Sequence, residues 1–596
     1  MSGIVGWVDY NKDLRGKENV IQDMIAALQS RGGSESARYV SESALLCGRG
    51  DEPITLTCGG ETYVLVADCR LTDTERLQSE LGCAGQKLCQ KSLLLRAYAE
   101  RGESCLDYIE GSFAFAIWRQ KAGILFLARD RMGVRPLFCR RTRSGVIFAS
   151  EIKALFRHPQ CPAHLDAEGF KQIFLLGPGR ISGSGVYRNI QELEPAQCLT
   201  LDRDGFKKRH YWSLRACEYN LSEAAAAEAA RELITAAVLK QLDDGTPCGA
   251  MLSGGLDSSI VTAIAARKYA ACGLRMPTYS VDYEGNTRNF VKSKFQHTHD
   301  GEYIDIMSNA AGTAHKNITL DNREVAHSLK AAAEARDLPG MGDVDSSLLL
   351  FCREISKTVP AVLTGECADE IFGGYPWFFD PQLLHGEGFP WMCSMEIRAR
   401  LLGMRDISVA RDYADALARR TIKSADTLSG EDANDRRMRQ MFLLSYKWFM
   451  QTLIDRADRM RGPLDIRVPF CDRALVEFAY NLPWKLKALG GREKGIMRAA
   501  FADMLPSDIT ERKKTPYPKT FDPWYANYVK KEAAHAVASS PILQQLIDTD
   551  YFSGLLSSSD PNSVDPWYGQ LMRLPQLCAF LIQTAHLFEE YKVKPV

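Results

Sequence analysis

The stretch Pro247–Ile260, PCGAMLSGGLDSSI, determines the fold of the larger part of this chain. It consists of a short apolar run, a loop of Ser and Gly, and the start of a helix. Gly254 and Gly255 can adopt positive φ, so consecutive backbone N–H groups can turn toward a phosphate, and the helix adds the positive end of its dipole. The plainer alternative is a Gly/Ser turn that only joins a strand to a helix. The pattern predicts an anion site at the end of a strand.

The polar residues of this loop, and a second stretch like it, point to a shared site. The loop lacks the Lys of a Walker A sequence, so we expect it to hold a leaving pyrophosphate rather than to guide γ-phosphate transfer. Ser253, Ser258 and Ser259 add hydroxyl donors, and Asp257 is a candidate Mg²⁺ ligand. The run Ala361–Tyr375, AVLTGECADEIFGGY, also passes from a β-branched segment into a small-residue turn that carries acids. Two such strand ends predict one pocket.

Composition excludes several classes of protein. The 596 residues predict roughly two to four domains, and a hydrophobic content of 45% is enough for large cores. Lys+Arg and Asp+Glu balance at 74 each without a basic run, so neither nucleic acid nor an anionic membrane is an expected partner. The 17 Cys form no CxxC pair or Cys/His cluster, which argues against zinc and disulfides. With no signal peptide or long apolar stretch, we expect a cytoplasmic protein.

The pattern of secondary structure changes once along the chain. Residues 1 to about 205 carry short strand-like runs such as ETYVLVAD, GILFLARD and GVIFASE. After a polar boundary at Leu201–Ser222, a strong helix is expected with Ser222 as its N-cap. Parallel strands are then predicted at Cys248–Leu252, MPTYSVDY and PAVLTGEC, with the ligand beyond their carboxyl ends. Trp391–Trp448 and the C-terminal third are expected to be helical, and Ser557–Pro566 an exposed loop.

Taken together, SGGLDSS and TGECADEIFGGY closely resemble the synthetase domain of the asparagine synthetase family, and the resemblance covers nearly the whole chain. It continues through DRADRMRGPLDIRVPFCD (Asp455–Asp472) and GREKGIMRAAF (Gly491–Phe501). MSGIVGWVD, GSFAFAIW (Gly111–Trp118), LARDRMGVRPLF (Leu127–Phe138) and FASEIKAL (Phe148–Leu155) resemble the N-terminal-nucleophile glutaminase domain of that family. The resemblance implies an αββα sandwich over residues 1–210, followed by an adenine-nucleotide α-hydrolase-like parallel α/β synthetase domain over residues 211–596.

The resemblance also implies a reaction. ATP activates a carboxylate as an acyl-adenylate, and ammonia or an amine then forms the amide. Asp257 and Asp369 would hold Mg²⁺, Lys494 would face the α-phosphoryl group, and Glu366 would take a proton from the amine. Plainer roles are a helix N-cap for Asp369, a surface charge for Lys494, and pairing with a neighbouring Arg for Glu366. The residues assigned to the nucleotide by resemblance are Leu252, Ser253, Gly254, Gly255, Asp257, Ser258, Ser259, Val281 and Gly365.

The carboxylate substrate is suggested by the segment Asp337–Phe351, DLPGMGDVDSSLLLF, which resembles the substrate region of the asparagine synthetases. Asp343, Asp345 and Ser346 could receive an α-ammonium group. Alternatively, these residues cap the helix that begins near Ser346. Aspartate is the leading substrate by resemblance, and a homodimer is a further expectation.

The glutaminase-like half departs from its family at each part of the catalytic pocket. Ser2 stands where the nucleophilic Cys is expected. The family sequence HRGPD becomes SRGGSES, which keeps Arg31, and NGEIYN aligns with a run that begins Asp68-Cys69, so that an anion faces the oxyanion. The RRLSIID loop shrinks to the region of Arg49, and the acid of SDTEV is lost. We expect a retained scaffold rather than a slow serine hydrolase.

This degeneracy leaves three functions open. The chain could be an ammonia-dependent asparagine synthetase, or an amide ligase or cyclase similar to the β-lactam synthetases and lasso-peptide cyclases. It could also be a non-catalytic protein that binds a nucleotide or a partner. The presence of Asp257, Glu366, Asp369 and Lys494 argues against the third function. DVDSSLLL and ECADEIFGGY favour the first.

Overall fold

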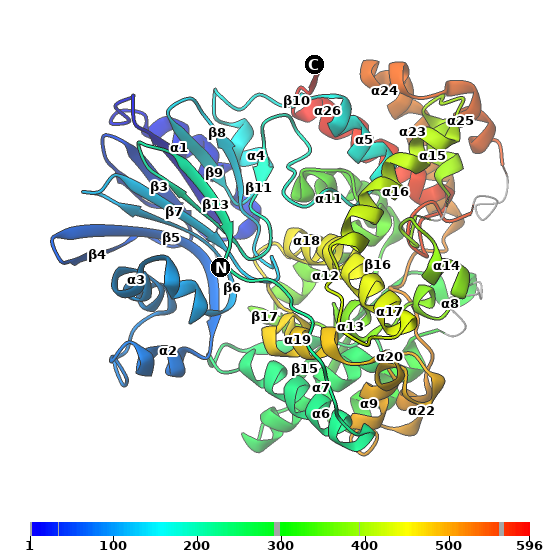
Figure 1. The fold of residues 1–596 in the computed structure, drawn as a ribbon. Coiled ribbons are helices and arrows are strands. Elements are labelled where there is room, and N and C mark those ends of the chain that lie inside the picture. The colour runs from blue at the N-terminus through cyan, green and yellow to red at the C-terminus, as the bar shows by residue number, and fades with distance from the viewer. Residues whose placement is uncertain (1–2, 34, 291–298, 393, 559–564) are drawn as a thin grey trace. The chain divides into compact units, whose positions relative to one another are not determined.

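The structure is a computed structural model that describes residues 3–33, 35–290, 299–392, 394–558 and 565–596. The chain forms two compact units, which are described separately here (Figure 1). The first unit comprises Met1–Gly169, Ile181–Ser213 and Val593–Val596. The second comprises Phe170–Arg180 and Leu214–Lys592. The chain therefore passes between the units more than once, where the sequence predicted a single boundary near residue 210.

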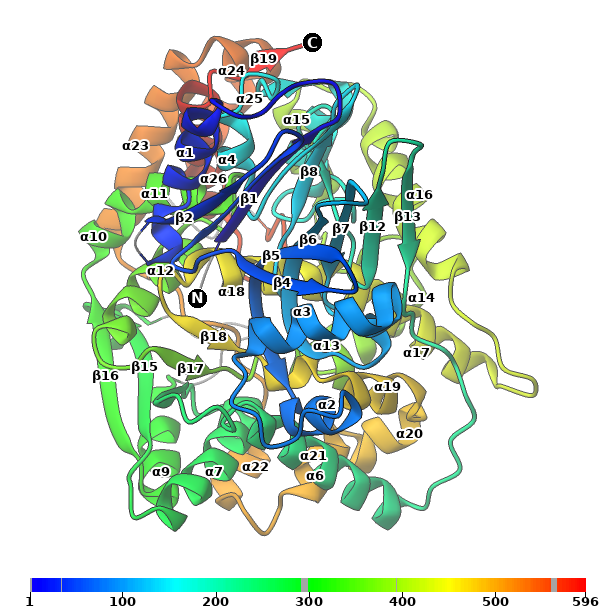
Figure 2. The ribbon, with the colours of Figure 1, turned by 90° about the vertical axis from the view of Figure 1, so that its left-hand side faces the viewer.

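The first unit contains two six-stranded antiparallel sheets, seen in Figure 2. One sheet has the order β11 (Gln191–Glu192), β8 (Phe138–Arg141), β9 (Gly145–Ala149), β1 (Gly3–Asp9), β3 (Ala44–Arg49), β2 (Glu35–Val40). The other has the order β13 (Phe206–His210), β12 (Gln197–Leu201), β7 (Ile124–Arg129), β6 (Glu110–Arg119), β5 (Glu61–Thr72), β4 (Ile54–Cys58). A short parallel pair joins β10 (His164–Leu165) to β19 (Lys594–Pro595).

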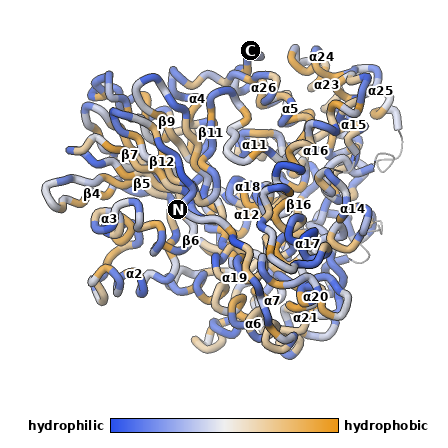
Figure 3. Tube along the Cα trace, in the orientation of Figure 1, coloured by the Kyte–Doolittle hydropathy of each residue, from blue (hydrophilic) through white to orange (hydrophobic). Residues whose placement is uncertain are grey.

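Apolar residues on alternate positions of the strands give this unit two cores. Residues of both sheets, among them Val8, Leu46 and Val66, form the core between the sheets. The opposite face of the second sheet packs Phe115 and Leu94 with the helices α2 (Thr74–Glu80) and α3 (Gln90–Arg101). The helices α1 (Glu18–Ala26) and α4 (Ile152–Phe156) pack against the first sheet. The apolar strand segments stand out in orange in Figure 3. The predicted αββα sandwich is confirmed.

The second unit is built on a five-stranded parallel sheet. Its order is β16 (Ala314–Leu320), β15 (Pro277–Tyr283), β14 (Cys248–Met251), β17 (Ala361–Leu363), β18 (Asp465–Arg467). In chain order this is 3-2-1-4-5, so the direction of winding reverses between β14 and β17. Ligands bind at the carboxyl ends of strands at such a switch point. The two sequence stretches that predicted a pocket leave the sheet at this point.

Helices connect and surround these strands. Ser222 caps α6 as predicted, because its side chain accepts a hydrogen bond from Ala225 N at 3.3 Å. The helices are α6 (Glu223–Lys240), α7 (Leu256–Ala271), α8 (Asn286–Asn289), α9 (Gly301–Ala311), α10 (Asn322–His327), α11 (Leu329–Arg336), α12 (Asp343–Ser356), α13 (Ala368–Phe372), α14 (Pro381–His385), α15 (Met395–Leu401), α16 (Ile407–Lys423), α17 (Ala433–Leu444), α18 (Met450–Met460), α19 (Arg473–Asn481), α20 (Trp484–Lys487), α21 (Gly495–Ala500), α22 (Ser507–Glu511), α23 (Pro523–Ser539), α24 (Pro541–Leu546), α25 (Thr549–Leu556) and α26 (Leu574–Glu590), with α5 (Ala167–Lys171) where the two units meet in the chain.

Three expectations about the chain as a whole can be compared with this fold. The C-terminal third is helical, as predicted. The predicted loop Ser557–Pro566 falls largely outside the described residues. No helix in the described part of the chain is both long enough and apolar enough to span a bilayer.

Candidate active site

The loop after β14 is held by hydrogen bonds among its own residues. Ser253 N donates to Ser258 Oγ at 3.2 Å, and the hydroxyls of Ser253 and Ser258 lie 3.1 Å apart. Gly254 has φ +69°, and a Cβ there would lie 2.7 Å from Tyr303. Gly255 has φ −78°, so only one of the two glycines adopts the left-handed conformation that the sequence suggested for both. The turn is formed by Gly254, while Gly255 caps α7.

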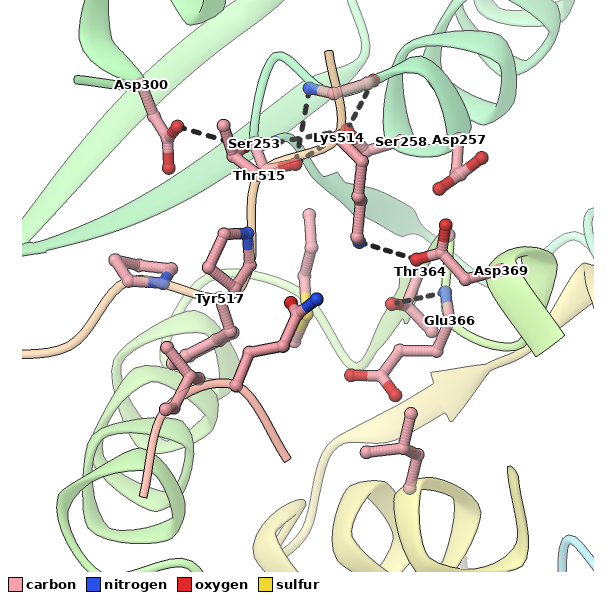
Figure 4. Close-up of a pocket in the computed structure, with 18 of the residues that line it drawn as sticks. Ser253, Asp257, Ser258, Asp300, Thr364, Glu366, Asp369, Lys514, Thr515 and Tyr517 are labelled. Atoms are coloured by element: carbon pink, nitrogen blue, oxygen red, sulfur yellow. Dashed lines mark hydrogen bonds and ion pairs between the residues drawn. The ribbon is translucent and has the colours of Figure 1, made fainter. Parts of the chain in front are cut away.

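A second loop, between β17 and α13, lies directly against the first. A Cβ on Gly365 would lie 2.8 Å from Ser258 N, so only glycine permits this close approach of the two backbones. Glu366 and Asp369 follow on the same loop and helix (Figure 4). Cys367 adopts φ +76°, which makes the sharp turn into α13. The acids that follow the two strands are therefore brought together, as the sequence predicted.

Two lysines bind the carboxylates of this site. Lys494 Nζ donates to Asp257 Oδ1 and Oδ2 at 2.8 and 2.6 Å, and to Asp369 Oδ1 at 2.7 Å. Lys514 Nζ lies 2.5 Å from Asp369 Oδ2. Burial raises the pKa of Asp257 despite Lys494. Burial also opposes ionisation of Asp369, but its contacts with both Lys494 and Lys514 hold its pKa well below the ordinary value. The synthetase cluster, as we call Asp257, Asp369, Lys494 and Lys514, contains two acids and two bases.

Part of the basic side of the site was missed from sequence. Lys514 and Arg512 belong to the run ERKKTPYPK, residues 511–519, whereas the sequence had been interpreted as lacking a basic run. Arg512 forms an ion pair with Asp300, and its Nη1 donates to Ser253 O at 3.0 Å. Three consecutive basic residues next to a Pro-rich turn are the sequence feature from which this basic side of the site could have been predicted.

Glu366 has one paired and one unpaired carboxylate oxygen. Arg456 Nη2 donates to Glu366 Oε1 at 2.7 Å, and the guanidinium also lies 5.2 Å from the centroid of the Tyr517 ring. Glu366 Oε2 is buried, and no hydrogen-bond partner is found for it among the residues that the structure describes. The pairing with an Arg, which was the plainer role considered for Glu366, is therefore present. It still leaves one oxygen of the carboxylate free to accept a proton.

These side chains surround a cavity of about 240 Å³ at the carboxyl ends of β14 and β17. Figure 4 shows Lys514, Asp369, Glu366 and Tyr517 around it. The predicted residues that line the cavity are Leu252, Ser253, Gly255, Asp257, Ser258, Val281, Gly365, Glu366, Asp369 and Lys494. Gly254 is in the turn but does not line the cavity, and Ser259 is fully buried in α7.

The three residues predicted to receive the substrate ammonium lie behind the cavity wall. Asp343 Oδ1 accepts a hydrogen bond from Gln576 Nε2 at 2.9 Å, and burial raises the pKa of Asp343. Asp345 Oδ2 accepts from Met341 N at 2.8 Å, and Ser346 Oγ donates to the backbone. The cavity is lined here by the apolar Met341, Val344, Leu348 and Phe351. An ammonium site made from Asp343, Asp345 and Ser346 stays a prediction that this geometry does not support.

In the first unit, the residues aligned with the glutaminase pocket form a buried ionic cluster. Arg31 Nε donates to Glu151 Oε1 at 2.6 Å, and Arg31 Nη1 donates to Asp68 Oδ2 at 3.2 Å. Lys153 pairs with Glu151, and Arg135 Nε lies 4.0 Å from Asp68 Oδ1. Arg31 and Asp68 are each only 2% exposed. This glutaminase-side cluster, Arg31, Asp68, Arg135, Glu151 and Lys153, does not line the cavity beside the synthetase cluster.

The other residues predicted for the glutaminase pocket are Arg49, Cys69 and Ser2. Arg49 ends β3, and Cys69 follows Asp68 on β5, where burial raises the pKa of its thiol to about 12. A thiol of that pKa is a poor nucleophile at neutral pH. Ser2 lies outside the described residues.

Comparisons with known proteins agree with both units. The asparagine synthase family model matches residues 229–580, and the glutamine amidotransferase domain model matches residues 1–212. Asparagine synthetase [glutamine-hydrolyzing] 3 of Bacillus subtilis is 40% identical over all of this chain and 99% of its own length. Asparagine synthetase [glutamine-hydrolyzing] 1 of the same organism is 24% identical, covering 92% of this chain and 91% of the relative.

Proposed function

Because this chain belongs to the asparagine synthetase family of ATP-dependent carbon–nitrogen ligases, we propose that it adenylates a carboxylate, releases pyrophosphate, and passes the acyl group to ammonia or an amine. The observation that carries the proposal is the synthetase cluster at the switch point of the parallel sheet. It brings Asp257, Asp369, Lys494 and Lys514 to one wall of a cavity. Aspartate is the proposed acid and asparagine the product, by analogy with the relatives' names.

The phosphates of ATP would lie over the loop Ser253–Ser258. The hydroxyls of Ser253 and Ser258 are directed toward one another, and the backbone turns at Gly254 into the start of α7. A helix start of this kind stabilises an anion through its free N–H groups and its dipole. Lys494 and Lys514 supply positive charge, which stabilises the negative charge that grows on the α-phosphoryl group. AMP and pyrophosphate are therefore the proposed products.

The residues present fit a magnesium ion. Asp257 and Asp369 direct oxygens to one shared cation, Lys494 Nζ, at 2.6–2.8 Å, and carboxylate oxygen is the donor that Mg²⁺ prefers. These two residues would hold the ion, whose charge would help to neutralise the leaving pyrophosphate. The binding of ATP is expected for the family, and that of Mg²⁺ is part of this proposal.

Glu366 is the proposed base for the second half-reaction. Its Oε1 is fixed by Arg456 at 2.7 Å, which orients the carboxylate, and Glu366 lines the cavity, with Oε2 buried and without a hydrogen-bond partner among the described residues. A general base must reach the proton that it removes from the amine. The base is needed only once the acyl-adenylate exists, so the two half-reactions would depend on different residues.

The nitrogen donor is proposed to be ammonia or an amine rather than glutamine. Hydrolysis of glutamine needs a nucleophile, an oxyanion hole and a pocket for the amino acid. At the aligned position Asp68 carries a carboxylate, and Arg31 binds both Asp68 and Glu151. The Bacillus relatives are named as glutamine-hydrolyzing, so this proposal separates the present chain from them.

One experiment tests the nitrogen donor and the product together. The protein is incubated with ATP, Mg²⁺ and aspartate, and with either ¹⁵N-ammonium or L-glutamine. We expect labelled asparagine with ammonium and no glutamate release with glutamine. Glutamate release at a rate equal to amide synthesis would contradict the assignment of the first unit. Failure of every amine to give amide, with ATP still consumed, would contradict the assignment of the acid.

A further inference from the structure

A second cavity, of about 260 Å³, lies in the larger unit and shares no lining residue with the candidate active site. It is bounded by α17, α20, residues 217–220 and residues 428–431. Trp484 on its wall packs directly on Gly373, since a Cβ there would lie 2.5 Å from the Trp484 ring. Gly373 ends α13, the helix that carries Asp369. The cavity is therefore a neighbour of the helix that supplies an acid to the synthetase cluster.

Lys487 is a buried cation on the wall of this cavity. Its side chain is 7% exposed, and no hydrogen bond or ion pair of Lys487 is found among the residues that the structure describes. Its Nζ lies 4.6 Å from the centroid of the Phe442 ring. Burial lowers the pKa of Lys487 to about 7. A buried ammonium with three free donors is costly, unless an anion supplies acceptors.

Arg439, 8% exposed, is a second cation on the same wall with an unused donor. Its Nε donates to Glu431 Oε1 at 2.9 Å, and its Nη2 binds the same oxygen. Within the described part of the chain, the buried Nη1 has no hydrogen-bond partner. The guanidinium lies 5.4 Å from the centroid of the Tyr480 ring, which holds it against the cavity wall.

The acids around the cavity do not neutralise Lys487. Glu431 is bound to Arg439, and Asp435 Oδ1 accepts a hydrogen bond from Trp484 N at 3.1 Å. Glu218 also lines the cavity, but it is exposed to solvent. These two cations therefore share a cavity whose lining also includes four aromatic side chains, those of Tyr219, Phe378, Tyr480 and Trp484.

We propose that this cavity binds a small organic anion, whose carboxylate or phosphate group accepts hydrogen bonds from Lys487 and Arg439 while the aromatic side chains contact its body. Charge-assisted hydrogen bonds in a desolvated pocket give specificity for such a group. The site lies apart from the synthetase cluster, so the anion is not a substrate of the proposed ligase.

The binding test uses isothermal titration calorimetry of the full chain with inorganic phosphate and with benzoate, at constant ionic strength in chloride. We expect saturable binding of one or both probes. Lys487→Met, which replaces the ammonium with an apolar group of similar length, should weaken binding at least tenfold. Lys485→Met, on the same helix but exposed, is the matched control and should bind as the unmodified protein does. Absence of saturable binding, or equal affinity in Lys487→Met, would overturn the proposal.

A second measurement needs no variant of Lys487. With a pKa of about 7, Lys487 is mostly neutral at pH 8, and a bound anion favours its charged form. Binding should therefore take up close to one proton, measured by titration in two buffers of different ionisation enthalpy. The cavity is also lined by Glu218, Glu431, Asp435, Arg439 and Tyr480, and burial raises the pKa of Tyr480 to about 12, so its hydroxyl stays neutral at this pH. Cys217 also lines the cavity, and the variant Cys217→Ser excludes a contribution of its thiol to the measured proton uptake. Binding without proton uptake would contradict the role of Lys487.

Discussion

The two units each bury a cluster of acids and bases, but the two clusters differ in what surrounds them. In the synthetase cluster, Lys494 bridges Asp257 and Asp369, and these residues line a cavity. In the glutaminase-side cluster, Arg31 bridges Asp68 and Glu151, and both acids are additionally approached by a base. The first arrangement leaves space for a ligand beside its charges. The second satisfies its charges internally.

We propose that this difference separates a reactive site from a structural one. Buried ion pairs contribute little net stability, but removal of one partner is costly, because a charge is left unpaired in a poorly solvated environment. Such a cluster can fix β5 to α4 through Arg31 without any catalytic role. At the carboxyl ends of parallel strands, however, the same chemistry faces a cavity and can exchange a protein partner for a phosphate. Five changes to the chain test this distinction.

The largest effect is expected for Asp257→Asn. It removes one of the two carboxylates proposed to hold Mg²⁺, so amide synthesis should fall by at least about 10³-fold. The free energy of unfolding should change little, because no core volume is lost. Steady-state synthesis and urea denaturation measure the two effects. Asp243→Asn, at an exposed acid paired with Lys268, is the control, and an active Asp257→Asn protein would exclude an essential role.

Lys494→Ala is expected to lower ATP–pyrophosphate exchange by roughly 10²–10³-fold. It deletes one preorganised positive charge at the α-phosphoryl group. Lys514 still neutralises Asp369 at 2.5 Å, which keeps the loss below that of Asp257→Asn. Lys268→Ala, at an exposed position, is the matched variant. Exchange within twofold of the unmodified rate would show that Lys494 only satisfies the two aspartates.

Glu366→Gln should slow amide formation much more than adenylation. ATP–pyrophosphate exchange is expected to stay within about tenfold of the rate of the unmodified protein. Amide formation should fall by roughly 10²–10⁴-fold, because a base acting on the amine is lost. The amide retains an oxygen that can accept the hydrogen bond from Arg456. Parallel assays of exchange and of asparagine formation measure the ratio. Equal loss in both assays would refute the proposed division of roles.

Arg31→Met should affect stability and not synthesis. It leaves Asp68 and Glu151 without their shared cation, although Arg135 and Lys153 remain close, so the first unit should lose about 2–4 kcal/mol. Ammonium-dependent synthesis should remain within twofold at temperatures where the protein is folded. Arg38→Met, at an exposed arginine of β2, should leave both quantities unchanged. A fall in synthesis without a fall in stability would give Arg31 a functional role.

The smallest effect is expected for Ser2→Cys. Restoring a thiol leaves the Asp68 carboxylate at the position that aligns with the family's oxyanion-hole sequence, where an oxyanion would need donors. Glutamate release from glutamine should therefore remain at background. A rate that rises with Ser2→Cys would show that the pocket around the nucleophile is otherwise intact.

The sequence predicted the architecture of both units because their patterns are local. The Ser/Gly loop, the acids after β17 and the helix capped by Ser222 each depend on neighbours in the chain. Lys514 was missed, because its contact with Asp369 joins residues 145 positions apart in sequence and no periodicity marks it. Asp343 and Asp345 show the converse. Acids beside a Gly-broken turn suggested a ligand, which stays a prediction, and the sequence did not indicate that one oxygen of each would accept a hydrogen bond from Gln576 or Met341.

All of these roles depend on adenylation of a carboxylate in the cavity beside the synthetase cluster. The most direct test is ATP–pyrophosphate exchange in the absence of any amine, with aspartate, glutamate and small carboxylic acids compared one at a time and the nucleotide products identified. We expect exchange that requires an acid, is fastest with aspartate, and yields AMP but no ADP when an amine is then added. Stoichiometric ADP, or exchange with none of the acids, would contradict it.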